Sequence, residues 1–192
     1  MASLIERKQH RARLRIIEAA DDLFADRGFN AVSVSDIAER AEVGRTTFFR
    51  HFGDKQEVVF AREREVLALI AVEDVPAPGA DPSDLIEALR ALQPIILGVT
   101  SRMTADADAF RRHMRLVQAH PELGERDAAK LQEIADLLGD LLTNRGWDAS
   151  VATLSGRLAV ACFQAARRES TDPTDLAERT RRALERILGL RP

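Results

Sequence analysis

Apolar residues recur at helical spacing along almost the whole chain, and this periodicity restricts the possible folds more than any other feature of the sequence. Ile16, Ala20, Leu23 and Phe24 follow the i, i+4, i+7, i+8 pattern of one helix face. Gly28 comes directly after this pattern and is a natural C-terminal cap. We therefore expect an all-α protein.

Two capping-box patterns predict where further helices begin. Ser33 is followed three residues later by Asp36, which predicts a short helix starting after Ser33. Asp54 stands in the same relation to Glu57. We expect the helix after Asp54 to run to about Val72 as a single rod of about 28 Å.

The segment 74–83, with three prolines and a glycine, is the clearest linker in the chain. After it the pattern predicts helices over about 83–101, 106–119, 121–144, 148–168 and 174–189, which makes about nine helices in all. Pro94 is expected to kink or split the first of these helices. Pro121 suits the first turn of a helix.

Charge is unevenly distributed. The chain of 192 residues carries a formal net charge of −3, which excludes a uniformly basic nucleic-acid coat protein. The first 15 residues nevertheless hold five basic side chains against one acidic one. A basic arm of this kind fits a polyanionic partner, and a solvated helix start explains it equally well.

The compartment can be inferred from what the sequence lacks. Cys162 is the single cysteine, so an intramolecular disulfide and a cysteine-only metal site are both excluded, and a reducing cytoplasm fits best. The first ten residues have no apolar core of a signal peptide. The longest apolar run, 67–72, is far too short to span a membrane.

The segment 33–55 has the helix lengths and spacing of a helix-turn-helix motif. It contains two short helices with an interruption near residues 42–44, and Arg45, Thr46 and Thr47 open the second helix. Arginine can donate two parallel hydrogen bonds to guanine, and threonine can bond phosphate or contact the thymine methyl group. A short helix pair also occurs in many all-α proteins that bind no DNA.

The string SVSDIAERAEVGRTTFFRHFGDKQEVV, with ADDLFADRGF before it, resembles the DNA-binding signature of the tetracycline-repressor (TetR) family. HPELGERDAAKL also resembles the regulatory half of actinobacterial members. The resemblance implies a dimeric transcriptional regulator, usually a repressor. Residues 1–53 would form the helix-turn-helix domain, and residues 54–192 would form a helical domain that binds a small effector and a second subunit.

The resemblance also implies which residues contact double-stranded DNA. Ser33 would cap the second helix near a phosphate, the recognition helix would carry Arg45, Thr46 and Thr47, and His51 and Lys55 would lie near the phosphate track. Phe49 is the exposed ring of this helix, and Arg7 and Arg11 would add phosphate contacts. The candidate DNA-binding residues are Arg7, Arg11, Ser33, Arg45, Thr46, Thr47, Phe49, His51 and Lys55.

The chain departs from the family pattern at four positions. Glu42 replaces the usual turn glycine, Gly44 replaces a serine cap, and Thr46 replaces a small residue. Phe49 replaces a tyrosine and so removes one hydroxyl contact to phosphate. These departures keep open an alternative, a helical ligand-binding or adaptor protein without specific DNA recognition.

Two apolar stripes are candidates for the effector site, which the resemblance places in the second domain. The candidate residues are Ile96, Val99, Met103, Phe110 and Met114. Ordinary core packing gives the same stripes. We expect a largely apolar small-molecule effector, with an acidic group as a further option because Arg102, His113 and Arg115 could hold one.

Two later stripes suit contact between subunits of a homodimer. The candidate interface residues are Leu154, Leu158, Cys162, Ala165, Leu184, Ile187 and Leu188. Closing the core of one subunit is the alternative role for both stripes. Cys162 itself is expected to be a small buried hydrophobe.

No pattern in the sequence points to an enzyme. We find no HExxH motif, no nucleophile elbow, no phosphate-binding glycine loop and no dinucleotide fingerprint. The four histidines are scattered, so we expect no metal site, and we expect no cofactor.

Overall fold

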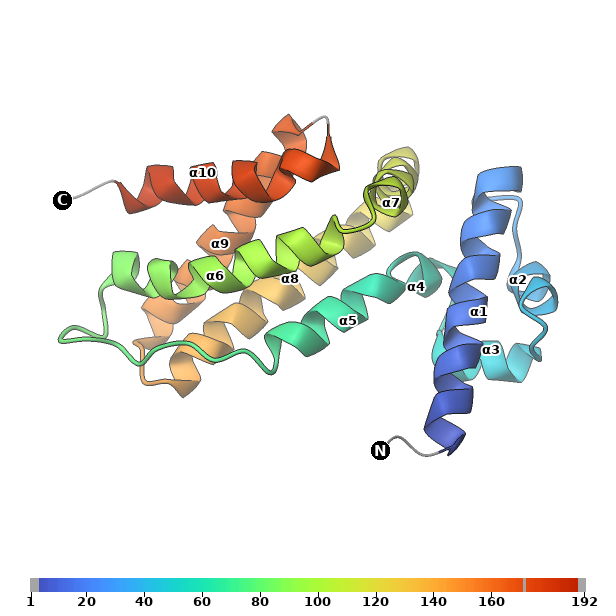
Figure 1. Cartoon of the computed structure of the whole chain (residues 1–192), viewed down its shortest axis with the longest axis horizontal. Helices are drawn as coiled ribbons and strands as arrows, with labels where there is room; N and C mark the ends of the chain where they lie inside the picture. The colour runs from blue at the N-terminus through green and yellow to red at the C-terminus, as the bar shows by residue number, and fades with distance from the viewer. Residues whose placement is uncertain (1–3, 171, 190–192) are drawn as a thin grey trace. The chain divides into compact units, whose positions relative to one another are not determined.

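A computed structural model describes residues 4–170 and 172–189, which form ten α-helices and one short 3-10 helix (Figure 1). The all-α fold is confirmed. The chain divides into two compact units, residues 1–62 and 63–192. Among the described helices none combines the length and the apolar character needed to cross a membrane.

The first unit contains α1 (Leu4–Arg27), α2 (Val34–Arg40), α3 (Arg45–His51) and α4 (Lys55–Val59). Gly28 ends α1 in the left-handed conformation, with φ of 78°, as expected of a glycine cap. This unit extends past residue 53, where the sequence places the domain boundary, because α4 packs against α1. The boundary between functional domains stays a prediction.

The second unit contains most of α5 (Ala61–Ile70), then α6 (Leu85–Met103), α7 (Ala107–Ala119), α8 (Pro121–Asn144), α9 (Ala149–Glu169), the 3-10 helix η1 (Pro173–Asp175) and α10 (Leu176–Leu188). These bounds confirm the predicted helices to within a few residues. Pro121 occupies the first turn of α8, as predicted. Pro94 was expected to kink or split its helix, and α6 continues through it without a split.

The predicted rod from Asp54 to Val72 is wrong, because the structure breaks it into α4 and α5. Phe60 lies at the break with φ of −98° and ψ of 16°, and its side chain is 1% exposed. Arg13 donates a hydrogen bond to the Ala61 carbonyl oxygen at 2.6 Å. Contacts within the first unit therefore accompany a helix break that local periodicity does not signal, and this break brings the count among the described residues to ten α-helices.

The segment between α5 and α6 is held against the turn that joins α8 and α9. Val75 is 2% exposed, and the Trp147 indole N–H donates to the Pro76 carbonyl oxygen at 3.0 Å. Arg145 forms an ion pair with Asp74. The proline-rich linker is thus a fixed part of the second unit.

The helices α8 and α9 form an antiparallel pair with a close approach at small residues. A Cβ placed on Gly156 would lie inside van der Waals contact of the Ala135 carbonyl oxygen and 3.0 Å from the Gly139 nitrogen. Gly139 in turn faces Ala152, which is completely buried. Glycine is needed at residue 156 because the two backbones meet there.

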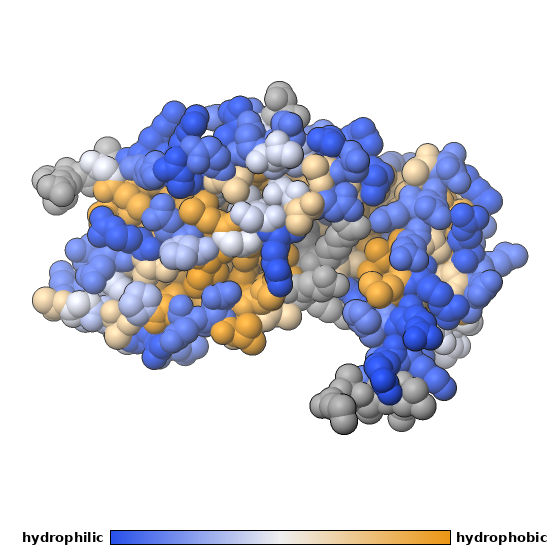
Figure 2. All heavy atoms as spheres, in the orientation of Figure 1, coloured by the Kyte–Doolittle hydropathy of each residue, from blue (hydrophilic) through white to orange (hydrophobic). Residues whose placement is uncertain are grey.

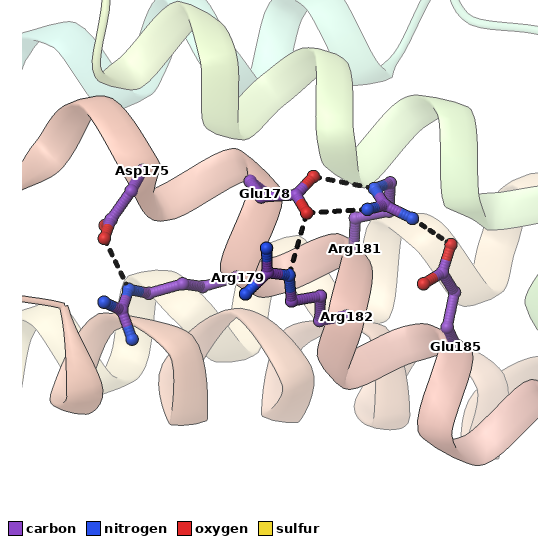
Figure 3. Close-up of polar contacts among 6 residues, drawn as sticks. All are labelled: Asp175, Glu178, Arg179, Arg181, Arg182 and Glu185. Carbon is purple, nitrogen blue, oxygen red and sulfur yellow. Dashed lines mark hydrogen bonds and ion pairs between the residues drawn. The ribbon is translucent and has the colours of Figure 1, made fainter.

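The outer surface of α10 is mostly hydrophilic in the view of Figure 2. Figure 3 shows charged side chains of this helix in two groups, the pair of Asp175 and Arg179, and a network formed by Glu178, Arg181, Arg182 and Glu185. Hydrogen bonds from Arg181 and then from Arg182 lower the pKa of Glu178 to about 2. The opposite face of α10 buries Leu176 and Leu184 in the core.

Candidate nucleic-acid interface and effector cavity

The helix α2 begins with a complete capping box. The Asp36 backbone N–H donates to the Ser33 hydroxyl oxygen at 3.2 Å, and the Ser33 backbone N–H donates to the Asp36 carboxylate at 2.8 Å. The Ser33 hydroxyl donates to the same carboxylate, and this side-chain hydrogen bond is the largest cause of the lowered pKa of Asp36. The predicted cap is confirmed, and a phosphate contact by Ser33 stays a prediction.

The turn between α2 and α3 retains the left-handed geometry of a glycine turn although residue 42 is a glutamate. Glu42 has φ of 53°, and it is the single described non-glycine residue with a positive φ. A left-handed conformation costs an L-residue roughly 1–2 kcal/mol. The Glu42 carboxylate lies 3.6 Å from the Arg15 guanidinium, in an exposed pair. The departure from glycine therefore alters the charge and strain of the turn, while the turn itself is kept.

One face of α3 is exposed and the other is buried. Arg45, Thr46, Phe49 and Arg50 are exposed and share one side of the helix, since residues four apart are neighbours on a helix surface. Phe48, on the opposite side, is fully buried. Phe49 is 47% exposed and meets Phe48 edge to face, with ring centroids 5.6 Å apart. The buried ring thus fixes which side of α3 faces solvent.

Arg50 is a candidate that the sequence reasoning missed. It is exposed and follows Thr46 by four residues, so it lies on the exposed face of α3. That spacing was the available signal. Thr47 is half-buried, and Gly44 precedes α3 without a side-chain cap.

His51 lies at the end of α3 and is half-buried. Burial lowers its pKa, and the positive charges of Arg50 and Arg13 lower it further. The Nε2 atom is buried and has no hydrogen-bond partner within the described part of the chain. Both effects favour the neutral form of the imidazole.

Lys55 has an internal role that the sequence did not predict. Its ammonium donates to the carbonyl oxygens of Phe29 at 2.8 Å and Val32 at 2.9 Å, and it lies 4.3 Å from the centroid of the Phe29 ring. These bonds hold the loop that leads into α2. Two of its three N–H donors are engaged, which leaves one for a phosphate.

The basic residues of the N-terminus belong to a helix. Arg7 and Arg11 are exposed, lie within α1 and are four residues apart, so they share one face of it. The described part of the predicted basic arm is therefore an exposed surface of helix α1.

The comparisons with known proteins agree with this geometry. Residues 16–61 match the family model described as bacterial regulatory proteins of the tetR family. The regulator TcmR of Streptomyces glaucescens is 29% identical over 169 residues, which cover 84% of this chain and 72% of TcmR. Residues 16–61 therefore belong to the DNA-binding domains of the TetR family. This match and the similarity to TcmR agree with the prediction of a regulator instead of an enzyme.

Sequence identity is higher in the segment that matches the TetR family model. The repressor Rv3405c of Mycobacterium tuberculosis is 52% identical over 46 residues, which are 24% of each chain. A crystal structure of Thermus thermophilus FadR, a TetR-family repressor in complex with lauroyl-CoA, matches with a TM-score of 0.57 at 23% identity, covering 94% of this chain and 96% of FadR. The likeness to FadR shows the fold alone.

A small cavity lies in the second unit. Its volume is about 10 Å³, close to the space that one water molecule needs. Its wall is entirely apolar and consists of Ile96, Val99, Met103, Leu131, Ile134, Val160 and Phe163, which come from α6, α8 and α9. Three of the five predicted effector residues thus line one cavity. Phe110 and Met114 pack against the same core without lining it.

The predicted subunit contacts fall into two groups. On α9, Leu154 is 47% exposed, Leu158 is half-buried and Ala165 is exposed, so these three face outward. On α10, Ile187 and Leu188 are half-buried. The structure places the other two residues, Cys162 and Leu184, in the core of the chain at 4% and 0% exposed, so we remove them from the candidate interface. Burial raises the pKa of the Cys162 thiol, as expected for an unreactive core cysteine.

Proposed function

We propose that this chain is a transcriptional repressor that binds a pseudo-palindromic operator as a homodimer in the cytoplasm and is released by a small, largely apolar effector. The observation that carries the proposal is the exposed face of α3. It presents Arg45, Thr46 and Phe49 on a helix that Phe48 anchors in the core. A helix of this kind can place its side chains against base edges in the major groove.

The contacts divide into base readout and positioning. Arg45 and Thr46 would read bases, with Phe49 and Arg50 beside them on the same face. The phosphate contacts would come from Arg7, Arg11, Ser33, Thr47, His51 and Lys55. For Lys55 one free N–H donor supports such a contact, and its other two donors hold the loop before α2.

Selection from a randomised DNA duplex pool tests the DNA-binding proposal. We expect an inverted repeat whose half-sites lie one helical turn, about 34–36 Å, or a multiple apart. Arg45→Ala should weaken binding to the selected sequence by roughly 1–3 kcal/mol and relax preference at one base pair. Arg90→Ala, at an exposed arginine of α6, is the control and should change neither.

A second variant separates positioning from readout. Arg11→Ala should weaken binding to all sequences alike and reduce the slope of log affinity against log salt by about 1, as expected for one lost phosphate contact. Equal losses of sequence preference from Arg11→Ala and Arg45→Ala would contradict this division.

The homodimer proposal is supported by the outward apolar stripe of α9, which contains Leu154, Leu158 and Ala165, together with Ile187 and Leu188 of α10. A matching stripe on a second subunit would make a four-helix interface. Leu154→Arg should shift the chain to monomers in sedimentation equilibrium. Val72→Arg changes an apolar residue that is 80% exposed outside this stripe and should leave the association unchanged.

The effector proposal is supported by the apolar cavity between α6, α8 and α9. A volume of about 10 Å³ holds no organic ligand, so binding would require these helices to move apart. FadR was crystallised in complex with lauroyl-CoA, a molecule with an apolar acyl chain, and this supports an apolar effector for the present chain. An effector that binds the operator-incompetent state better would weaken DNA binding by its differential affinity, typically about 1–3 kcal/mol.

The alternative, a helical ligand-binding or adaptor protein without specific DNA recognition, is favoured by Glu42, Gly44 and Phe49. The Glu42 carboxylate adds negative charge beside α3, Gly44 leaves α3 without a side-chain cap, and Phe49 offers no hydroxyl to a phosphate. The same duplex pool discriminates between the two proposals, since an adaptor would enrich no sequence.

A further inference from the structure

One ion pair in the second unit is buried, unlike the exposed pairs on the surface. Arg167 of α9 donates to both carboxylate oxygens of Asp127 in α8, at 3.0 and 2.6 Å. The side chains are 16% and 8% exposed, and the Arg167 guanidinium lies 5.6 Å from the centroid of the Phe163 ring. Desolvating two charges is costly, and apolar residues of similar size stabilise a core as well or better. Packing alone therefore gives little reason for this pair.

The pair lies at one end of the apolar cavity. Leu131 follows Asp127 by four residues on α8, and Phe163 precedes Arg167 by four residues on α9. Residues four apart share a helix face, so each member of the pair is one turn from a residue that lines the cavity. Because α8 and α9 run antiparallel, both turns lead toward the same end (Figure 1).

The apolar cavity and the ion pair at its end together indicate the chemistry of the two ends of a ligand. The cavity wall offers only apolar surface, and the group one turn beyond it is a guanidinium that already binds a carboxylate in a bidentate fork. A ligand carboxylate would meet the same geometry, since the fork matches any carboxylate. A neutral hydroxyl could not form the bidentate ion pair, and an ammonium group has no lone pair to accept a hydrogen bond from Arg167.

We propose that the effector is an apolar molecule with a terminal carboxylate, whose body opens the cavity and whose carboxylate competes with Asp127 for Arg167. This inference rests on the effector cavity proposed above. Asp127 then acts as an internal carboxylate that occupies the guanidinium while the cavity is closed. Removing its charge should favour the ligand.

The test compares three probes of equal chain length, namely decanoate, decanol and decyltrimethylammonium, titrated into the full-length protein by calorimetry below their aggregation limits. We expect decanoate to bind at least tenfold more tightly than the other two. Asp127→Asn keeps the shape of the side chain and should raise decanoate affinity at least threefold without changing decanol affinity. Arg167→Met should bring decanoate down to the affinity of decanol.

Arg168→Gln is the matched control, because Arg168 is the next residue along α9 and is exposed. It should leave all three affinities unchanged. Circular dichroism of Asp127→Asn establishes that the fold is intact, so the test holds even where Arg167→Met unfolds. Decanol binding as tightly as decanoate would overturn the head-group inference and leave the apolar cavity standing. No binding by any probe would overturn both proposals.

Discussion

The close approach of α8 and α9 allows a stability prediction of opposite sign at two helical glycines. Gly156 lies where a Cβ would overlap the Ala135 carbonyl oxygen and stand 3.0 Å from the Gly139 nitrogen. Gly98 lies within α6, and a Cβ there would meet nothing within 4 Å. Replacement by alanine makes the same chemical change in both helices, so the surroundings alone decide the sign.

The magnitudes follow from two opposing effects. Alanine is favoured over glycine in a helix interior by about 1 kcal/mol, which is the expected gain for Gly98→Ala. Overpacking costs typically about 1–3 kcal/mol. At Gly156 the obstructing atoms belong to the backbone of the facing helix, so a change of side-chain rotamer cannot relieve the overlap. We therefore take the upper end of the overpacking range, about 3 kcal/mol. The net loss for Gly156→Ala is then about 2 kcal/mol.

The assay is thermal unfolding followed by the fluorescence of Trp147, the single tryptophan, which reports on the second unit. In a chain of this size 1 kcal/mol shifts the midpoint by roughly 2–4 °C, so Gly156→Ala should melt about 4–8 °C lower and Gly98→Ala about 2–4 °C higher. A Gly156→Ala midpoint at or above that of the unsubstituted protein would refute the reasoning. Equal decreases for both variants would refute it as well.

Three further predictions concern the first unit. Glu42→Gly should relieve the left-handed strain at residue 42, but glycine also adds about 0.5–1 kcal/mol of backbone entropy to the unfolded chain. The net increase in the free energy of unfolding, measured in urea, should be about 0.5–1 kcal/mol. Glu42→Ala keeps the strain, so an increase in stability from that variant would contradict this cause. Ser33→Ala should cost about 1 kcal/mol through loss of the α2 cap, and an unchanged urea midpoint would argue against it. Burial and neighbouring arginines lower the pKa of His51, so the unfolded state binds its proton more readily and stability should fall as pH drops below about 6.5. His51→Gln should flatten the dependence of the urea midpoint on pH between 7.5 and 5.5, while His10→Gln at an exposed site should not.

Helix positions and caps could be read from the sequence because their causes are local. The Ser33 cap needs only a carboxylate three residues later, and the buried Phe48 and exposed Phe49 follow from helical spacing around α3. The exposed side chains of the candidate DNA-binding surface could therefore be predicted from the sequence. Arg50 could have been predicted in the same way, because it follows Thr46 by four residues on α3.

The buried and bent parts depended on neighbours distant in sequence. Cys162 and Leu184 stand in apolar stripes that suit either a subunit interface or a core, and only the packing of α9 and α10 places them inside. Lys55 turns inward because two loop carbonyls lie within its reach. Phe60 breaks the predicted rod because its ring is buried in the first unit.

The amino-acid sequence by itself determined the helical class, most of the helix limits and the side chains that a short recognition helix exposes, since these depend on periodicity and on contacts within a few residues. The tertiary structure decided which apolar face is covered, where the chain bends and that Asp127 and Arg167 meet at the end of a cavity. Those outcomes arise from the packing of helices far apart along the chain, and spacing within one helix carries no information about its partner.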